Sequence, residues 1–266
     1  MVGFDTAAAA ALMDELTAIS QRAAAAIKRV GETGDVRIKD DGSPVTPADE
    51  AAETVIRDGL ADLDPALPIV SEEQAARERP RVDAGSYFLV DPLDGTREFI
   101  AGRDEYAINI ALVTDGTPLL GIINAPALGL IWRGVVGRGA ERIAAASGAP
   151  APPQAIHTRR RPAEGLVAVV SRSHLDAGTL AFLARFPGVR RIASGSAIKF
   201  CRVAEGAADI YPRLAPTHDW DVAAGDAIIT AAGGRVVAPD GARLRYGTAD
   251  LIIPGFIACG DQTTIV

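Results

Sequence analysis

Cysteine is scarce in this 266-residue chain, which contains only Cys201 and Cys259. Two cysteines without metal-ligand spacing exclude a secreted disulfide framework and a thiolate metal site. We expect reduced intracellular thiols, with a single structural disulfide as the alternative. Aromatic residues are also few, at 5% of the chain, which leaves little surface for stacking single-stranded nucleic acid.

Long hydrophobic runs and long basic runs are both missing. Asp14 and Glu15 interrupt the apolar stretch at 7–13, and no basic segment precedes it, so we expect neither a signal peptide nor a membrane span. The chain has 34 acidic and 27 basic residues and a net charge of -7. This balance disfavours binding to a nucleic acid polymer, and a cytoplasmic protein is the default expectation.

The composition that remains is that of an ordinary globular protein, with 48% hydrophobic and 23% charged residues. It excludes disorder, collagen and coiled coil. Periodicity predicts helices at about 6–30, 46–63, 176–186, 198–206 and 222–232. Apolar runs predict strands at 68–70, 87–90, 106–114, 118–124, 166–171 and 190–193. No internal repeat is evident.

Loop signals divide this pattern. Gly31 and Gly34 are expected to end the first helix, and the polar stretch at 37–44 is expected to be a mobile loop. The segment 144–154, which contains Pro150, Pro152 and Pro153, has the composition of a linker. We therefore predict an N-terminal α+β half over 1–145 and a C-terminal α/β half over 156–266.

The stretch from Val90 to Phe99 carries the clearest chemical signal. Asp91 and Asp94 stand three residues apart at the carboxyl end of an apolar strand, where Pro92 stiffens the turn. Hard cations prefer oxygen ligands, and the Leu93 carbonyl lies between the two carboxylates as a third. The N–H groups after Gly95 could hold an anion beside such cations. We therefore expect a metal bridged to a phosphate here.

The alternative is that Asp91 and Asp94 serve only as turn and cap residues, because Asp-Gly is a common turn pair. Further acids stand at other strand and helix ends, namely Glu72 with its neighbour Glu73, and Asp221. Asp221 could be a helix cap and Glu72 a solvated side chain. Glu72, Asp91, Asp94 and Asp221 could also meet at one edge of a sheet. The residues alone leave both interpretations open.

Four segments together resemble the inositol monophosphatase-like, lithium-sensitive metal phosphatases. In this sequence they read Val-Thr-Pro-Ala-Asp at 45–49, Ser-Glu-Glu at 71–73, Asp-Pro-Leu-Asp-Gly-Thr at 91–96 and Trp-Asp-Val-Ala-Ala-Gly at 220–225. Within that superfamily the chain is most similar to bacterial 3′(2′),5′-bisphosphate nucleotidases, through 171–174, 195–201 and 211–213. The resemblance spans nearly the whole chain and implies a layered α-β-α-β-α sandwich of the sugar phosphatase type.

The resemblance implies a site for two or three Mg²⁺ ions. Its ligands would be Glu72, Asp91, the Leu93 carbonyl, Asp94 and Asp221. Thr96, polarised by Asp49, would orient the attacking water, and Glu72 joins these two as a catalytic candidate. Direct attack by Thr96 is the competing mechanism, disfavoured because a threonine is a poor nucleophile without a nearby base.

The substrate implied is 3′-phosphoadenosine 5′-phosphate, whose 3′-phosphate would be removed. The Gly95 and Thr96 N–H groups would hold that phosphate, while Lys199 and Arg213 would hold the second one, since cationic side chains form charge-assisted contacts to phosphate. Ser196 and His174 are further candidate contacts. Lys199 and Arg213 could instead be a snorkelling and a solvated side chain.

Two positions depart from the pattern of the nearest relatives. Arg97 stands where lysine is usual, and Ile253 where asparagine is common. Neither position is one of the implied metal ligands, so neither departure puts the metal site in doubt.

Other functions on the same fold are inositol monophosphatase or fructose-1,6-bisphosphatase activity, and a metal-binding protein without activity. The oligomer is a monomer or a homodimer. Some bacterial relatives are loosely attached to a membrane, so a peripheral position at the inner membrane is an alternative to a purely cytoplasmic one. With five acids in one site, the net charge does not argue against a small phosphate ester, because the recruited cations reverse the local field.

Overall fold

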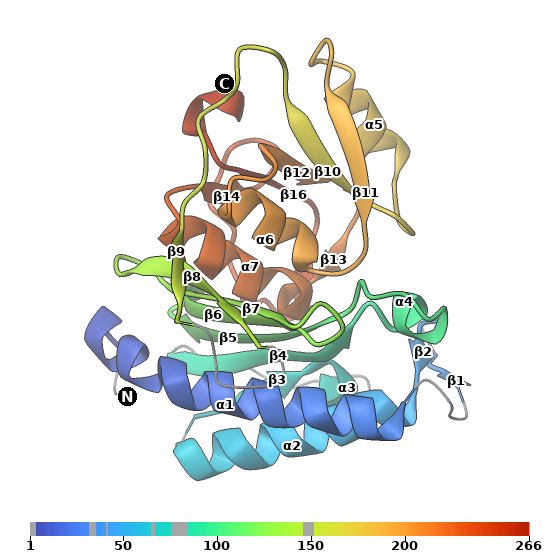
Figure 1. Ribbon diagram of the computed structural model, residues 1–266, viewed down its shortest axis with the longest axis vertical. Helices are drawn as coiled ribbons and strands as arrows, with labels where there is room; N and C mark the ends of the chain where they lie inside the picture. The colour runs from blue at the N-terminus through green and yellow to red at the C-terminus, as the bar shows by residue number, and fades with distance from the viewer. Residues whose placement is uncertain are drawn as a thin grey trace.

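Five layers of helix and sheet make up the molecule, as Figure 1 shows. The structure, a computed structural model, describes residues 4–31, 36–40, 42–64, 67–75, 85–145 and 152–265. From the bottom of Figure 1 upward, a helix pair, a large sheet, a second helix pair, a smaller sheet and a last helix follow one another. This arrangement confirms the α-β-α-β-α sandwich.

The outer helix pair consists of α1 (Thr6–Val30) and α2 (Pro47–Leu63). The Asp5 carboxylate caps α1 by accepting hydrogen bonds from two backbone N–H groups of its first turn, and Gly31 ends it with a φ of 72°. Apolar side chains on one face of each helix pack on the large sheet and form a continuous core. Gly34, the other expected stop, lies outside the described residues.

The large sheet has seven strands that follow one another in chain order. They are β3 (Ile69–Ser71), β4 (Ser86–Asp94), β5 (Ala107–Thr114), β6 (Thr117–Ala125), β7 (Leu130–Val135), β8 (Gly139–Ala144) and β9 (Gln154–Ile156). Among the described strands of this sheet, only β3 and β4 pair in parallel. The second face of the large sheet packs on the inner helix pair, α6 (Ile198–Ala204) and α7 (Asp219–Ala231).

The smaller sheet has five strands in the order β11-β10-β12-β16-β14. They are β10 (Val167–Ser171), β11 (Arg190–Ser194), β12 (Ile210–Arg213), β14 (Arg235–Val237) and β16 (Phe256–Cys259). Helix α5 (Ala177–Leu183) covers its outer face. Both cysteine thiols are free and buried beside this sheet and α6.

Helix α7 approaches the large sheet closely because glycine stands at the contact. A Cβ on Gly121 of β6 would lie 2.2 Å from the Ala224 carbonyl oxygen, a distance that no side chain tolerates. A Cβ on Gly225 would likewise lie 2.3 Å from the Phe200 ring of α6. The small residues after Trp220 therefore bring the first turn of α7 down to the end of β4.

Short elements complete the described chain. They are β1 (Arg37–Ile38), β2 (Pro44–Val45), α3 (Glu72–Ala75), α4 (Thr96–Ile100), β13 (Thr217–His218), β15 (Ile252–Ile253) and the 3₁₀ turn η1 (Gln262–Ile265). Within the described part of the chain, no helix is long and apolar enough to span a bilayer.

Several sequence predictions need correction. The expected loop over 37–44 is wrong at both ends, because Arg37–Ile38 and Pro44–Val45 pair as an antiparallel hairpin. The last helix begins at Asp219 rather than 222, since His218 and Asp221 cap it. Most of the expected linker, 146–151 with Pro150, lies outside the described residues. The division into halves at 145 and 156 stays a prediction, and β9 still pairs with β8 in the large sheet.

Candidate active site

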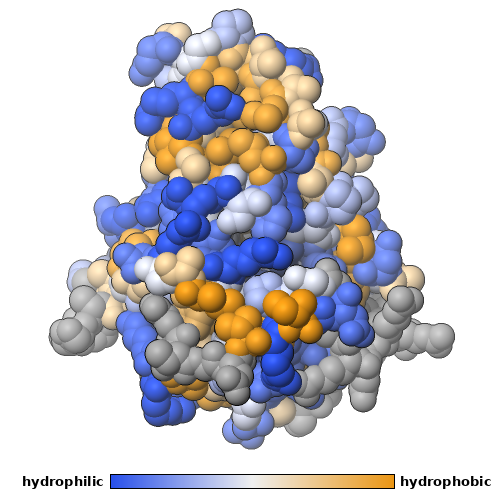
Figure 2. Space-filling view, turned by 90° about the vertical axis from the view of Figure 1, so that its right-hand side faces the viewer, coloured by the Kyte–Doolittle hydropathy of each residue, from blue (hydrophilic) through white to orange (hydrophobic). Residues whose placement is uncertain are grey.

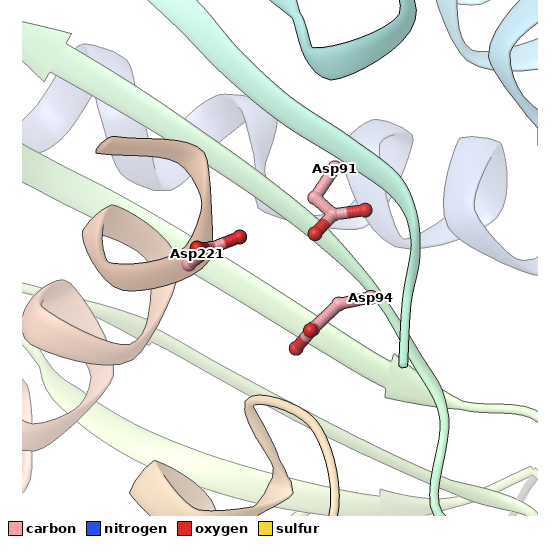
Figure 3. A group of neighbouring side chains, drawn as sticks. All are labelled: Asp91, Asp94 and Asp221. Carbon is pink, nitrogen blue, oxygen red and sulfur yellow. The ribbon is translucent and has the colours of Figure 1, made fainter. Parts of the chain in front are cut away.

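Three carboxylates converge where the end of β4 meets the start of α7. One oxygen each from Asp91, Asp94 and Asp221 lies within 4.8 Å of the others, and Figure 3 shows the three side chains directed toward a common space. Asp91 is buried and the other two are partly buried. Residues 130 positions apart in the chain are thus brought together by the packing of α7 on the large sheet.

An irregularity in β4 turns Asp91 and Asp94 to the same side. The register of β4 against β5 shifts between these residues, so that the strict alternation of side chains is broken there. The Asp91 carboxylate accepts a hydrogen bond of 3.0 Å from the Leu93 N–H, which fixes the turn. Gly95 follows with a φ of 94°, and a Cβ at this position would lie 2.9 Å from the Glu105 carbonyl oxygen.

Each of the three carboxylates is bonded to the fold through one oxygen. Asp91 uses Oδ1, Asp94 uses Oδ2 to accept from the Ala197 N–H, and Asp221 uses Oδ2 to accept from the His218 N–H. Among the described residues, no hydrogen bond is found to the second oxygen of any of them. The three aspartates therefore do have structural roles in turns and caps. Each of them keeps one oxygen that a ligand could contact.

Burial and neighbouring acids raise the pKa values of Asp91 and Asp94. The pKa of Asp91 lies well above its ordinary value because of burial and the nearby Glu72, Asp94 and Asp221 carboxylates. That of Asp94 is raised to about 6 by burial and by Asp221. A buried set of carboxylate oxygens in mutual repulsion fits a divalent cation, which takes such ligands and cancels the repulsion.

Glu72 lines the same pocket as the three aspartates, which is described below. Its Oε1 accepts a hydrogen bond of 2.8 Å from Lys39, which also donates to Glu73 at 2.6 Å. Burial raises the pKa of Glu72 to about 8 despite this partner. The structure thus pairs Glu72 with Lys39 instead of joining it to the three aspartates, and its role as a metal ligand stays a prediction.

Thr96 and Asp49 meet as the sequence predicts. The Thr96 hydroxyl lies 3.2 Å from Asp49 Oδ1 and 3.1 Å from the Leu93 carbonyl oxygen, and donates to them. Asp49 is the third residue of α2, and its Oδ2 accepts from the N–H and hydroxyl of Thr46 in a capping box. Burial raises the Asp49 pKa to about 6, so the group is mostly ionised at neutral pH.

A pocket of about 320 Å³ opens beside the carboxylates. Every residue proposed for substrate binding lines it: Gly95, Thr96, His174, Ser196, Lys199 and Arg213. Figure 2 shows hydrophilic residues gathered across the middle of the face that carries α4 and β11. The pocket is lined by residues of β4 and α4 and by residues of α6, β12 and α7, which come later in the chain.

Two cationic side chains, Lys199 and Arg213, also line this pocket. Lys199 is 3% exposed, its ammonium donates to the Ser196 carbonyl oxygen, and it lies 5.2 Å from the centre of the Tyr211 ring. Burial lowers the Lys199 pKa to about 8. Arg213 donates to the Pro216 carbonyl oxygen at 3.1 Å, and its buried Nε has no hydrogen-bond partner among the described residues. The pocket therefore carries two cationic side chains, and Lys199 interacts electrostatically with Asp94, Glu98 and Glu105.

Sequence reasoning missed several pocket residues. Glu98, 4% exposed, accepts a hydrogen bond from Ser173, and Tyr211 packs against Phe200. His218, which the sequence left without a role, lines the pocket with its ring stacked 4.5 Å from that of Trp220. Glu98 lies within the 90–99 stretch and Tyr211 within the 211–213 segment, but neither has a spacing to other residues that indicates a role.

Comparison with known proteins agrees with this geometry. The model of the inositol monophosphatase family matches residues 4–261. The chain belongs to the inositol monophosphatase family. It is 39% identical over 249 residues to the 3′(2′),5′-bisphosphate nucleotidase CysQ of Escherichia coli K12, covering 92% of this chain and 98% of that protein.

Solved structures of the family share the fold. CysQ from Bacteroides thetaiotaomicron superposes with a TM-score of 0.79 and 33% identity, over 93% of this chain and 96% of that one. An inositol monophosphatase from Anabaena superposes with a TM-score of 0.73 and 25% identity, over 95% and 91% of the two chains. The full-length matches confirm the family and the fold predicted from the four sequence segments.

Proposed function

We propose that this family member is a Mg²⁺-dependent phosphomonoesterase that converts 3′-phosphoadenosine 5′-phosphate to AMP and phosphate. The observation that carries the proposal is a single pocket lined both by the three aspartates, its metal side, and by Lys199 and Arg213, its cationic side. A substrate with two phosphates matches both sides. The similarity to bisphosphate nucleotidases along nearly the whole chain supports the same substrate.

The metal side would hold two or three Mg²⁺ ions. Asp91, Asp94, Asp221, the Leu93 carbonyl and Glu72 are the proposed ligands, and all of them line the pocket. Glu72 would have to exchange Lys39 for a cation. Divalent cations held there supply charge that offsets the phosphoryl oxygens and makes a water molecule more acidic.

Thr96 and Asp49 would direct the attacking water. Because the Thr96 hydroxyl donates its proton toward Asp49, its oxygen is left to accept a hydrogen bond from water. The Gly95 and Thr96 N–H groups, at the turn that leads into α4, would bind the oxygens of the phosphate that leaves. Asp49 stays fixed by Thr46 throughout, so it needs no rearrangement.

The cationic side would hold the 5′-phosphate. Lys199 and Arg213 are the proposed contacts, and the unpartnered Arg213 Nε is a donor that an anion could satisfy. Ser196 and His174 also line the pocket and would contact the nucleotide. A sugar monophosphate has no second phosphate for Lys199 and Arg213 to contact.

Phosphate release from three substrates tests the proposal. We expect fastest turnover of 3′-phosphoadenosine 5′-phosphate, slower turnover of inositol 1-phosphate and fructose 1,6-bisphosphate, none with EDTA, and inhibition by lithium. Preference for either sugar phosphate would assign the chain to the alternative activities. Absence of turnover on all three, with Mg²⁺ bound, would favour a binding protein.

The cellular setting remains a prediction from the sequence. We propose a cytoplasmic enzyme, with a peripheral position at the inner membrane as the alternative, that works as a monomer or homodimer on a small nucleotide rather than on a nucleic acid polymer. Cell fractionation and light scattering test these points.

A further inference from the structure

The segment 195–197 forms the wall of the pocket that comes from the C-terminal half. It joins β11 to α6, and Ser196 at its centre has a φ of 49°, an uncommon conformation for a residue with a side chain. The N–H groups on either side of Ser196 donate to carboxylates of the N-terminal half. Gly195 donates to Glu105 at 3.0 Å, and Ala197 donates to Asp94.

Glu105 contacts both glycine turns of the site through its backbone as well. A Cβ on Gly95 would lie 2.9 Å from the Glu105 carbonyl oxygen, and a Cβ on Gly195 would lie 2.8 Å from the same atom. The turn proposed to bind the leaving phosphate and the wall proposed to contact the nucleotide are therefore packed against one residue. A shift of Glu105 would change the distance between them.

Arg172 fixes the Glu105 carboxylate. Its guanidinium donates to both Glu105 oxygens, at 2.7 and 2.8 Å, and to the Ala193 carbonyl oxygen at 3.1 Å. This two-point contact lowers the Glu105 pKa, so the carboxylate stays ionised throughout the neutral range. Arg172 directly follows Ser171 of the pocket, and its own N–H donates to the Ser194 carbonyl oxygen at 3.1 Å.

We propose that Glu105, oriented by Arg172, is a positioning residue for substrate binding, which holds the Gly195–Ala197 wall in register with the metal-binding half. The inference rests on the proposed function, because it concerns the pocket side that takes the nucleotide. Neither Glu105 nor Arg172 lines the pocket, so both act through the wall and not by touching substrate.

Two carboxylates hold the wall: Glu105 accepts from Gly195 and Asp94 accepts from Ala197. They differ in their relation to the proposed metal site. Asp94 belongs to the carboxylate cluster, so loss of that anchor would alter cation binding as well. Glu105 contacts none of the three aspartates through a hydrogen bond, and its loss releases the Gly195 end of the wall and removes a negative charge that acts on Lys199. The expected signature is therefore a weaker affinity for the nucleotide with unchanged dependence on Mg²⁺.

The chain contains a matched control for this contact. Arg159 binds both oxygens of Asp209, at 2.6 and 2.9 Å, and Asp209 also accepts a backbone N–H, from Val167 at 2.6 Å. The two arginine side chains are equally exposed, at 38% each. Asp209 and Arg159 lie away from the pocket, so breaking this pair reports the cost of losing such a contact without moving the wall.

Steady-state kinetics of Glu105→Ala, Glu105→Gln, Arg172→Met and Arg159→Met test the inference. Removal of a charge-assisted contact that aligns the wall should raise the KM for 3′-phosphoadenosine 5′-phosphate about tenfold in Glu105→Ala and Arg172→Met. Their kcat and Mg²⁺ midpoints should match the wild type. Glu105→Gln keeps an acceptor for the Gly195 N–H, so its KM should lie between the wild-type value and that of Glu105→Ala. For p-nitrophenyl phosphate, which has no second phosphate or nucleoside, the KM should not change.

Three results would overturn the inference. They are an unchanged KM in Arg172→Met and Glu105→Gln, an equal KM increase in Arg159→Met, or a change confined to kcat or the Mg²⁺ midpoint. If Glu105→Ala does not fold, the other two variants decide. Wild-type turnover tests the proposed function separately. If the wild type prefers another phosphate ester, the ratio of variant to wild-type KM on that ester still tests the positioning role.

Discussion

Replacing Asp91 with Asn should make the metal-free protein more stable while abolishing turnover. Asp91 is 1% exposed and lies among like charges, and its hydrogen bond from the Leu93 N–H is one that the Asn carbonyl oxygen can also accept. The substitution therefore removes a charge without removing the contact that holds the turn. Stability and activity should change in opposite directions.

The expected gain follows from the spacing of the cluster. Two unit charges at 4.8 Å, the limit of separation here, repel by roughly 3.5 kcal/mol at an effective dielectric constant near 20. Water in the open pocket and partial protonation reduce this, so we expect a net gain of about 2 kcal/mol at pH 8. In a chain of this size that gain corresponds to a rise in Tm of about 4–8 °C.

The gain should depend on pH in a defined direction. In the unfolded chain these carboxyl groups titrate near pH 4, whereas burial raises the folded pKa to about 6 for Asp94 and about 8 for Glu72. Such groups stabilise the folded protein fully below pH 4, and this contribution is lost as the pH rises through 6 and 8. The advantage of Asp91→Asn should therefore be large at pH 8 and small at pH 5.

Thermal unfolding in EDTA and in Mg²⁺, combined with phosphate release, measures these effects. Mg²⁺ should raise the wild-type Tm at pH 8 and have a much smaller effect on Asp91→Asn, whose turnover should be lost. A metal-free variant less stable than the wild type at pH 8, or one with normal turnover, would refute the reasoning.

Three further predictions concern single positions in the pocket. Thr96→Val should lower kcat about a hundredfold, because the attacking water loses its orienting hydroxyl, while the Mg²⁺-induced shift in Tm, measured as above, stays the same. Lys199→Met should raise the KM for the bisphosphate about tenfold. In the wild type this KM should also increase above pH 8, since the Lys199 pKa is about 8 and the neutral amine binds phosphate weakly. Gly95→Ala should cost about 1–3 kcal/mol in urea unfolding and most of the activity, because a φ of 94° is strained for alanine and its Cβ meets the Glu105 carbonyl oxygen.

Most of the fold could be predicted because its signals are local. The cap at Thr46, the proline after it and helical periodicity defined α2. Apolar runs located β5 and β6 closely, and located the first part of β4. The hairpin formed by β1 and β2 was missed because two-residue strands have no periodicity to detect. Strands β7 and β8 were missed too, since Gly134 and Arg142 interrupt their apolar pattern.

The candidate site could be predicted in its chemistry but not in its contacts. Asp91 and Asp94 stood out by their spacing, and the meeting with Asp221 followed from the family resemblance rather than from sequence distance. The pairing of Glu72 with Lys39 depends on the hairpin of β1 and β2, which sequence reasoning treated as a loop. The contact between Glu105 and Gly195 joins residues 90 positions apart through a tertiary arrangement that no local pattern encodes.

The position of the bond that is hydrolysed tests the central claim most directly. Phosphorus NMR of the products from 3′-phosphoadenosine 5′-phosphate, with Mg²⁺ and with EDTA, distinguishes the two monophosphates. The account predicts adenosine 5′-phosphate and free phosphate in Mg²⁺ and no reaction in EDTA, because the proposed contacts of Lys199 and Arg213 to the 5′-phosphate would direct the 3′-phosphate to the aspartates. Release of adenosine 3′-phosphate, or turnover in EDTA, would contradict it.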